Sequence, residues 1–384
     1  MVAQPMKLFL IAGEPSGDRL GAALMAGLKS LAPEVEFAGI GGPLMQEQGL
    51  KSLFPIDELS VMGIAEVLPK YRALKRRIAQ TAAAALAYVP AAMITIDSPD
   101  FCLRVAKIVK SARPSLRTIH YVAPSVWAWR PGRAAKMARV IDHVMALLPF
   151  EPPYMTAAGM TCDFVGHPVV SEPVATKAQA AAFRQSQNIA PDVPLIAVLP
   201  GSRKGEITRL APRFGEVVAQ VIAKHPTARI VIQTVQSQQA LVRDLTQSWP
   251  GHPVYLTAPS PMERAAAFTA ADVALAASGT VSLELAAQSC PMVIAYDLNR
   301  LTYWLMRKMA LIDTVTLVNL VTETRTVPEF LGERCRADLI TPAVLGLLKD
   351  GGDQLLAMRQ SMKLLGQGDE APGLRAAKSV LSVL

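Results

Sequence analysis

The chain has 384 residues, of which 51% are hydrophobic, which excludes a disordered chain and provides enough apolar side chain for two domains. Lysine and arginine number 39 against 31 aspartates and glutamates, and the net charge of +8 suits an acidic partner such as a phosphorylated substrate, although an enzyme that is simply basic has the same balance. The four cysteines are widely spaced and form no CxxC pair, which argues against disulfides and against a zinc site.

Short apolar runs alternate with segments of helical spacing along the whole chain. The runs begin at Lys7, Val35, Ala92, Leu116, His143, Leu195, Ala228, Val254, Val273 and Met292. This alternation predicts parallel sheets in α/β layers, and runs that are apolar almost throughout are typical of strands covered on both faces. We expect no targeting segment, and the longest apolar stretch, residues 82–96, contains Pro90 and falls short of the roughly 18 residues that a membrane span needs.

A change of composition divides the chain into two halves. Residues 170–194 are polar and contain three prolines, so we place a domain boundary near residues 169–176. The economical architecture is two Rossmann-like domains facing a cleft, because such sheets bind ligands beyond the carboxyl ends of their strands. The expected division is residues 1–170, residues 171–352, and C-terminal helices in residues 353–384 that could pack back on the first domain or on a partner chain.

The first apolar run ends in a glycine-rich turn at residues 13–18. Ser16 or Asp18 could simply cap the helix that follows, or the turn could border a substrate. No complete GxGxxG follows this run, so it is not a dinucleotide-binding fingerprint. The chain contains no GxxxxGK[ST], which excludes a P-loop.

Residues 61–79 combine apolar and basic side chains. Val61 and Met62 belong to the apolar part, and Lys75, Arg76 and Arg77 belong to the basic part. Such a segment suits a helix lying on anionic lipid. A surface helix with a solvated basic face is the more common explanation when the sequence is considered alone.

Two aspartates follow the apolar run at residues 92–96. Asp97 ends the run and Asp100 lies three residues later, where α/β enzymes keep reactive groups. One carboxylate here is a fair general base for a sugar hydroxyl, and Asp100 is the better placed because it lies further from the strand. Both residues are equally well explained as turn and cap residues.

The next run leads into a loop with two tryptophans. His120 lies at its strand end, and Trp127 and Arg130 lie in the loop. The tryptophans could fill the core or form a wall that contacts sugar or acyl chain. His120 by itself fits a hydrogen-bonded strand histidine better than a catalytic residue.

Two loops in the second half each follow an apolar run and precede a helical segment. The loop after residues 195–199 contains Gly201, Ser202 and Arg203. The loop after residues 273–277 contains Ser278, Gly279 and Thr280, and Glu284 follows one helical turn later. Helix N-termini attract phosphate, so the pair of loops suggests a bound nucleotide diphosphate.

Together these segments resemble the lipid-A-disaccharide synthases, which are inverting glycosyltransferases of the type B fold. The resemblance covers nearly the whole chain and includes residues 13–18, 61–64, 97–101, 120–130, 147–151, 166–168, 199–203, 278–284 and 319–329. The HYVAPSVWAWR block at residues 120–130 is highly specific, whereas PGSR and SGT also occur in other nucleotide-sugar transferases. Pro15 is a small departure, because many relatives are expected to have Thr or Ala there.

The resemblance implies transfer of a sugar from UDP-2,3-diacylglucosamine to 2,3-diacylglucosamine 1-phosphate. The product is a β-1,6-linked disaccharide 1-phosphate, with release of UDP, a step of lipid A assembly in Gram-negative bacteria. It also implies that residues 1–170 bind the acceptor and face the membrane, and that residues 171–352 bind the UDP-sugar. Neither a metal nor a cofactor is implied, and the expected location is the cytoplasmic face of the inner membrane.

The resemblance also implies roles for individual residues. It places a base in residues 97–100, which we assign to Asp100, with Asp97 orienting the loop or serving in its place. The UDP-binding residues are Gly201, Ser202, Arg203, Ser278, Gly279, Thr280, Glu284 and Asn319. The substrate-facing residues are Glu14, Ser16, His120, Trp127 and Arg130, and the membrane-contacting residues are Val61, Met62, Lys75, Arg76 and Arg77.

Three other functions fit some of these features. A type B transferase or epimerase acting on a soluble sugar shares the phosphate loops but has no need of the basic and apolar helix. A nucleotide-binding module on a membrane surface, without catalysis, leaves the aspartates unused. An NAD-dependent oxidoreductase lacks its glycine fingerprint. No nucleic-acid partner is expected, and the apolar C-terminal helices suggest a homodimer only weakly.

Overall fold

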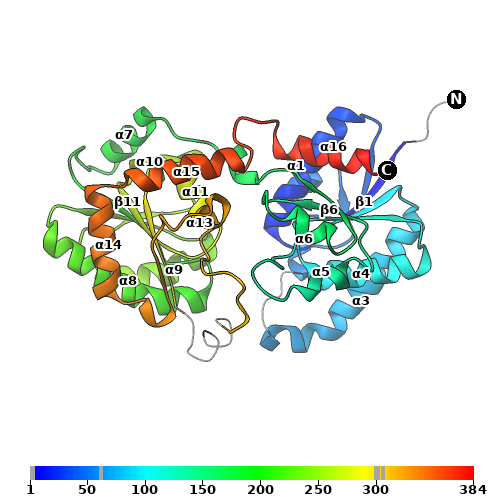
Figure 1. Cartoon of the computed structure of the whole chain (residues 1–384), viewed down its shortest axis with the longest axis horizontal. Helices are drawn as coiled ribbons and strands as arrows, with labels where there is room; N and C mark the ends of the chain where they lie inside the picture. Colours follow the sequence, from blue (N-terminus) through cyan, green and yellow to red (C-terminus); the bar gives the residue numbers. More distant parts are fainter. Residues whose placement is uncertain (1–4, 60–63, 298–302, 304–307) are drawn as a thin grey trace. The chain divides into compact units, whose positions relative to one another are not determined.

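The computed structural model describes residues 5–59, 64–297, 303 and 308–384, without the side chains of residues 64–71. The chain forms two compact units (Figure 1). The first contains Met1–Pro168 and Gly368–Leu384, and the second contains Val169–Gln367. The chain thus leaves the first unit once and returns to it at its C-terminal end.

The first unit contains a parallel sheet in the order β3-β2-β1-β4-β5-β6-β7. Its strands are β1 (Lys7–Ala12), β2 (Glu36–Ile40), β3 (Lys51–Ser52), β4 (Ala92–Ile96), β5 (Arg117–Tyr121), β6 (His143–Ala146) and β7 (Thr161–Phe164). Its helices are α1 (Pro15–Leu31), α2 (Pro43–Glu47), α3 (Ile64–Tyr88), α4 (Pro99–Ala112), α5 (Gly132–Met137), α6 (Pro152–Thr156) and α16 (Pro372–Ser382).

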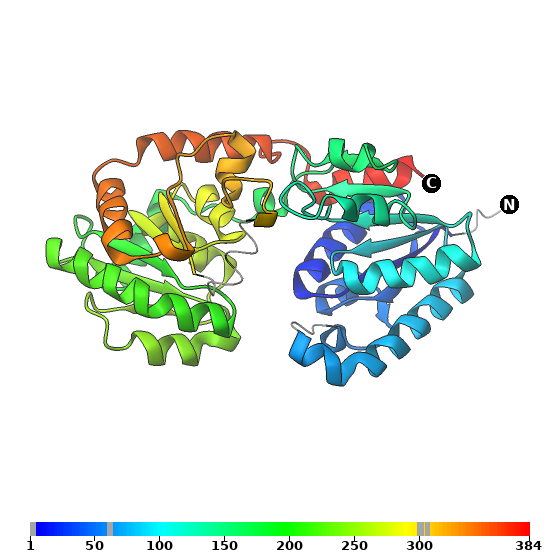
Figure 2. The ribbon, with the colours of Figure 1, turned by 60° about the horizontal axis from the view of Figure 1, so that its bottom comes forward.

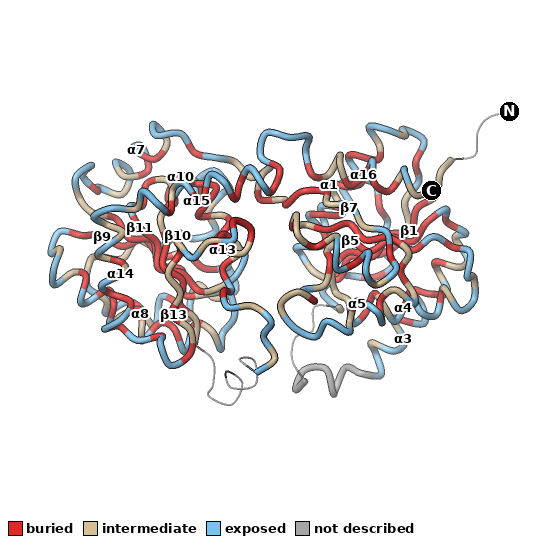
Figure 3. The backbone as a smooth tube through the Cα atoms, in the orientation of Figure 1, coloured by how far each residue is buried: buried red, intermediate tan, exposed pale blue. Residues whose placement is uncertain are grey.

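Helices cover both faces of this sheet, as Figures 1 and 2 both show. Alternate residues of β1 enter different cores: Phe9 packs with side chains of α3, α4 and α5, whereas Leu10 packs with side chains of α1 and α16. A strand buried on both faces must be apolar at nearly every position, which explains the continuous apolar run. Figure 3 shows the strands as the most buried part of the unit.

The C-terminal helix α16 packs closely against α1. A Cβ on Gly27 would lie 2.7 Å from the Gly373 carbonyl oxygen, so only glycine permits this approach of the two backbones. Side chains fix the helix further, because the Ser379 hydroxyl donates to Asp163 Oδ2 at 2.7 Å and lies 2.8 Å from His143 Nε2. Helix α16 therefore completes one face of the first unit.

The second unit contains a parallel sheet in the order β10-β9-β8-β11-β12-β13. Its strands are β8 (Leu195–Leu199), β9 (Arg229–Gln233), β10 (Val254–Leu256), β11 (Val273–Ala277), β12 (Met292–Tyr296) and β13 (Glu329–Leu331). Its helices are α7 (Lys177–Ser186), α8 (Lys204–Lys224), α9 (Gln239–Thr246), α10 (Pro261–Ala270), α11 (Val281–Ala287), α13 (Leu317–Thr322), α14 (Ala337–Lys349) and α15 (Gly352–Leu364).

The predicted α/β class with parallel sheets is confirmed, and all ten apolar runs form strands. The sequence analysis missed β3, β7 and β13 among the described strands. Two are very short, and β7 is only partly buried, with the pattern exposed, intermediate, exposed, intermediate. Strands at or near a sheet edge need no continuous apolar run, so they leave little signal in the sequence.

Candidate active site

Four loops lie together at the carboxyl edge of the first sheet. They follow β1, β4, β5 and β6, which are neighbours in the sheet order. In parallel sheets this edge is where ligands bind. The loops after β1 and β4 are in close contact, because a Cβ on Gly13 would lie 2.4 Å from the Ser98 hydroxyl oxygen.

In the loop after β1, Glu14 precedes α1 and is half-buried, and Ser16 is exposed in the first turn of the helix. Asp18 is 3% exposed and serves another helix: its carboxylate accepts hydrogen bonds from the backbone N–H groups of Gly42 (2.8 Å), Leu44 (3.0 Å) and Met45 (3.0 Å). Asp18 is therefore a cap of α2, which leaves Glu14 and Ser16 as the polar side chains of this loop that border the edge.

The two aspartates after β4 differ in their surroundings. Asp97 and Ser98 both have left-handed backbones, with φ of 52° and 44°, and Asp97 Oδ1 accepts from the Ser98 N–H at 2.8 Å. Two such residues in succession store about 1–3 kcal/mol each. Asp100 is exposed in the first turn of α4. The turn thus presents Asp100 to solvent, whereas Asp97 stabilises the turn itself.

His120 and Trp127 are placed differently from each other. His120 is 1% exposed within β5, and its Nδ1 lies 2.7 Å from the Thr95 hydroxyl; burial lowers its pKa to about 4 and keeps it neutral. The geometry therefore ties His120 to the neighbouring strand and not to the open edge. Trp127 is half-buried, and the Arg130 guanidinium stacks 4.2 Å over the ring of exposed Trp129.

Glu151 is a site residue that the sequence analysis did not single out. It is 3% exposed and accepts hydrogen bonds from Trp127 Nε1 (3.1 Å) and from the N–H groups of Leu147 (3.1 Å) and Leu148 (3.0 Å). Burial raises its pKa to about 7 although these hydrogen bonds favour the ionised form. The ring of Phe150 meets Trp127 edge-on at 5.1 Å. Glu151 thus holds in place the loop after β5 that contains Trp127 and Trp129, called the tryptophan loop below.

In the second unit, the two glycine-containing loops follow adjacent strands, β8 and β11, and lie at the same carboxyl edge. Gly201 and Gly279 both have positive φ, 113° and 152°, which favours glycine. A Cβ on Gly279 would meet no atom within 4 Å, so this loop offers open backbone to a ligand.

At the start of α8, a carboxylate of the same helix binds backbone N–H groups that could otherwise bind phosphate. Glu206 Oε2 accepts hydrogen bonds from the N–H groups of Ser202 (3.0 Å) and Arg203 (3.4 Å). Burial raises the pKa of Tyr296, and the charge and hydrogen bond of Glu206 raise it further. The N–H groups of Ser202 and Arg203 are therefore not open, as expected from the sequence, but bonded to a side chain of the same helix. The acidic residue three positions after Arg203 has the spacing of a capping box and was the signal to notice.

Glu284 and Asn319 also have partners within the chain. Glu284 Oε2 lies 3.3 Å from Arg264 Nη1, a contact that sequence reasoning missed. Asn319 is 1% exposed, and its side-chain amide bonds to both backbone groups of Val327, at 3.0 and 2.9 Å, and to the Thr314 hydroxyl at 3.2 Å. Asn319 therefore braces the segment around α13, and its amide does not point to an open surface.

The expected membrane segment is described only in part, because Val61 and Met62 lie outside the described residues. Lys75 and Arg76 are exposed on α3. Arg77 forms an ion pair with Glu58, with 2.7 Å between Nη2 and Oε1, and its guanidinium stacks 4.3 Å over the ring of Phe54. Within the described ranges, no helix is long and apolar enough to cross a membrane, and no cluster of three metal-binding side chains occurs.

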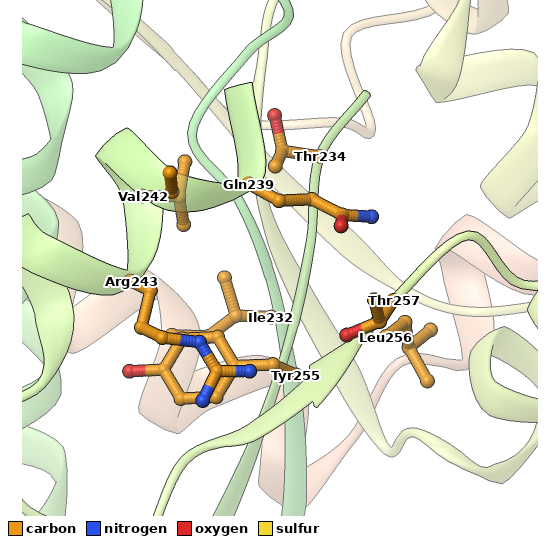
Figure 4. A pocket seen from close by; sticks show the side chains of 9 residues that line it. Ile232, Thr234, Gln239, Val242, Arg243, Tyr255, Leu256 and Thr257 are labelled. Carbon is orange, nitrogen blue, oxygen red and sulfur yellow. The ribbon is translucent and has the colours of Figure 1, made fainter. Parts of the chain in front are cut away.

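A cavity of about 300 Å³ opens at the carboxyl ends of β9 and β10, beside α9 (Figure 4). Gln239 Nε2 is buried there without a hydrogen-bond partner among the described residues, and the Arg243 guanidinium stacks 4.5 Å over Tyr255. The Thr234 hydroxyl donates to the Gly201 carbonyl oxygen at 2.9 Å, which links the cavity wall to the loop after β8. None of the predicted site residues lines this cavity.

Solved structures similar to this chain share its fold. UDP-GlcNAc 2-epimerase from Neisseria meningitidis, bound to UDP-GlcNAc, matches with a TM-score of 0.63 and 11% identity over 98% of this chain and 99% of its own. Anabaena HepE in complex with UDP and glucose matches with a TM-score of 0.59 and 12% identity over 99% of this chain and 100% of its own. These similarities confirm the predicted fold class.

Sequence relatives are much more similar. The lipid-A-disaccharide synthase of Ruegeria pomeroyi is 57% identical over 99% of this chain and 96% of its own length, and that of Rhodospirillum centenum is 45% identical over 99% and 95%. The family model described as lipid-A-disaccharide synthetase matches residues 8–377. The chain therefore belongs to the lipid-A-disaccharide synthase family.

Proposed function

We propose that this protein is a glycosyltransferase that joins two acylated glucosamines. The donor is UDP-2,3-diacylglucosamine, the acceptor is 2,3-diacylglucosamine 1-phosphate, and the products are the β-1,6-linked disaccharide 1-phosphate and UDP. The observation that carries the proposal is the family match over residues 8–377, which includes the edge loops of both sheets. Transfer to a soluble sugar is not favoured, because the relatives named above are lipid-A-disaccharide synthases.

In the proposed reaction, Asp100 takes the proton of the acceptor 6-hydroxyl. The oxygen attacks the anomeric carbon of the donor as the bond to UDP breaks, so the configuration at that carbon inverts. The exposed position of Asp100 in the first turn of α4 suits this role. Asp97, hydrogen-bonded to the Ser98 N–H, would orient the turn.

The second unit would hold UDP and stabilise its charge as it leaves. The Arg203 guanidinium, with Gly201 and Ser202, is the proposed partner of one phosphate, and the open loop of Ser278, Gly279 and Thr280 is the proposed partner of the other. Glu284 would accept hydrogen bonds from the ribose hydroxyls. Asn319 would act indirectly, through the segment that it braces.

The loops of the first unit would bind the acceptor. Glu14 and Ser16 border its edge, and Trp127 and Arg130 belong to the loop that Glu151 holds. His120 would support the neighbouring strand through Thr95. We further propose that α3 attaches to the cytoplasmic face of the inner membrane. We also propose a homodimer, which is supported by the 64% exposure of the apolar Leu356 on α15.

The test is turnover by variants of the two aspartates with both acylated substrates, measured as UDP release. We expect Asp100→Ala to lose at least about 100-fold in turnover, the usual contribution of a general base, and Asp97→Ala to lose less. Asp244→Ala, an exposed aspartate on α9, is the matched control. Normal turnover by Asp100→Ala beside an inactive Asp97→Ala would reverse the two roles, and release of UDP only with deacylated donor would contradict the substrate class.

A further inference from the structure

One arginine joins two carboxylates at the end of α10 nearest the proposed nucleotide site. Helix α10 begins after Ser260, whose hydroxyl oxygen accepts from the Glu263 N–H at 3.1 Å, and Arg264 lies in the first turn. Its Nη1 lies 3.3 Å from Glu284 Oε2, and its Nη2 lies 3.8 Å from Glu172 Oε2. The side chains of Arg264 and Glu284 are only 25% and 29% exposed. The shorter of the two contacts therefore joins α10 to the first turn of α11.

The surroundings of Arg264 are confined and held by hydrogen bonds. Arg264 and Glu284 line a narrow hollow of about 20 Å³ together with Pro261, Phe268 and Gln288. Gln288 fixes the neighbouring segment: its Nε2 donates to the Pro173 carbonyl oxygen at 2.9 Å, and its Oε1 accepts from the Ala175 N–H at 3.0 Å. The planar Arg264 guanidinium contacts two carboxylates at the wall of this hollow, and these contacts restrain both the arginine and the carboxylates.

We propose that Arg264 is a positioning residue that orients the Glu284 carboxylate for the two ribose hydroxyls of bound UDP. The inference rests on the proposed function, which gives Glu284 its ribose contact. Each restraint on a partly exposed carboxylate reduces the number of rotamers that it samples, and so reduces the entropy lost when a ligand binds. The ion pair orders it beforehand, so that Arg264 contributes to ribose recognition without touching the nucleotide.

The experiment compares the affinities of UDP and of its dideoxy analogue, which lacks both ribose hydroxyls, by calorimetry. The ratio of the two dissociation constants measures ribose recognition alone. We expect Arg264→Met to reduce this ratio by about 10-fold, the usual value of a hydrogen bond to a charged group, and to leave the affinity for the analogue unchanged. The double variant with Glu284→Gln should show no loss beyond that of Glu284→Gln.

Two further variants separate this effect from loss of charge or of folding. Arg336→Met removes an exposed arginine that pairs with Asp338, and it should leave the ratio unchanged. Arg264→Lys keeps the charge but not the planar guanidinium whose two Nη atoms contact Glu284 and Glu172. It should reduce the ratio to an intermediate value. If Arg264→Met does not fold, as judged by its thermal unfolding, the lysine variant provides the same measurement.

The failures can be told apart. If Glu284→Gln keeps the full ratio, Glu284 does not contact ribose, and both the proposed nucleotide site and this inference are overturned. If Glu284→Gln abolishes the ratio and Arg264→Met retains it, only the role of Arg264 is overturned. Equal weakening of both nucleotides by Arg264→Met would mean a direct contact or a structural role, and would also overturn the inference.

Discussion

Glu151 is a buried acid whose protonation links the stability of the protein to pH. Its carboxylate lies under the tryptophan loop and accepts three hydrogen bonds, yet burial holds its pKa near 7, well above its ordinary value of 4.5. Between these two pH values the folded protein keeps a proton that the unfolded chain has lost. The free energy of unfolding therefore falls as pH rises through this range, and the contribution of Glu151 is present in full only below it.

A titration of stability tests this behaviour. Between pH 5 and 7 we expect the free energy of unfolding of Glu151→Gln to fall less steeply than that of the unchanged protein, by up to about 1.4 kcal/mol per pH unit. Urea unfolding at a series of pH values measures the slope, and Glu47→Gln, an exposed glutamate of the same unit, is the control. Parallel slopes for Glu151→Gln and the unchanged protein would mean that Glu151 titrates normally.

Glu206 places a negative charge where the proposed diphosphate needs positive charge. Its carboxylate occupies the N–H groups of Ser202 and Arg203. We expect Glu206→Gln to bind UDP more tightly, by about 3- to 10-fold, because a repulsive charge at a partly screened site is removed. Calorimetry at low salt measures the affinity. Glu216→Gln, exposed on the same helix, changes the net charge equally and should leave it unaltered. Unchanged or weaker binding by Glu206→Gln would contradict the expectation.

For individual residues, the sequence predicts which strand a polar side chain follows better than it predicts which groups that side chain binds. It places the polar loops after the correct strands, since strand ends follow from hydrophobic patterning. It does not predict that Asp18 caps α2 or that Asn319 binds the backbone of Val327, because both contacts depend on how the backbone returns in space. The local contact of Glu206 with the start of α8 could have been predicted from its spacing after Arg203. The side chains of Asp18 and Asn319 form hydrogen bonds within the protein. A sequence motif does not distinguish such residues from residues that face a ligand.

Helix α3 is the element on which the proposed membrane attachment depends. Its residues Lys75 and Arg76 are exposed, and Arg77 forms an ion pair with Glu58. Each basic residue near an anionic surface contributes about 1 kcal/mol, so Lys75→Ser with Arg76→Ser should weaken binding to anionic liposomes roughly 30-fold. Co-sedimentation at low and high salt measures this.

The matched control for α3 lies on the neighbouring helix. Arg104→Ser with Lys107→Ser removes the same charge from exposed positions of α4. We expect these changes to leave liposome binding within about 2-fold of the unchanged protein, because screening limits charges that do not approach the lipid. An equal loss from both pairs would mean that overall charge, and not α3, attracts the protein to the surface.

At the scale of elements, burial decides what the sequence predicts. The ten strands found from apolar runs include the central ones, which are buried on both faces. The two-residue β3 is too short to show a pattern, and β13 was not found because it begins with the charged Glu329. The equally short edge strand β10 was found because all three of its residues are apolar or aromatic. The partners of α15 and α16 were equally unpredictable, since an amphipathic helix does not reveal which apolar surface it covers.

For the molecule as a whole, separate cores predict separate unfolding. Among the described residues, the buried side chains of the first unit form two clusters, and those of the second unit form a separate one. We expect two thermal transitions in calorimetry. UDP at a hundredfold excess over its dissociation constant should stabilise one of them by about 2.7 kcal/mol, which is roughly 5–10 °C for a unit of this size. A single transition, or an equal shift of both, would show that the units unfold as one body.

The path of the chain also has a consequence for synthesis. One face of the sheet of the first unit is covered by α16, whose residues are translated after those of the whole second unit. Until then Leu10, Leu24 and their neighbours lack part of their cover, and exposed apolar surface of this kind promotes aggregation. The first unit therefore begins to be synthesised before the second, but its sheet is fully covered only after all residues of the second unit have been synthesised.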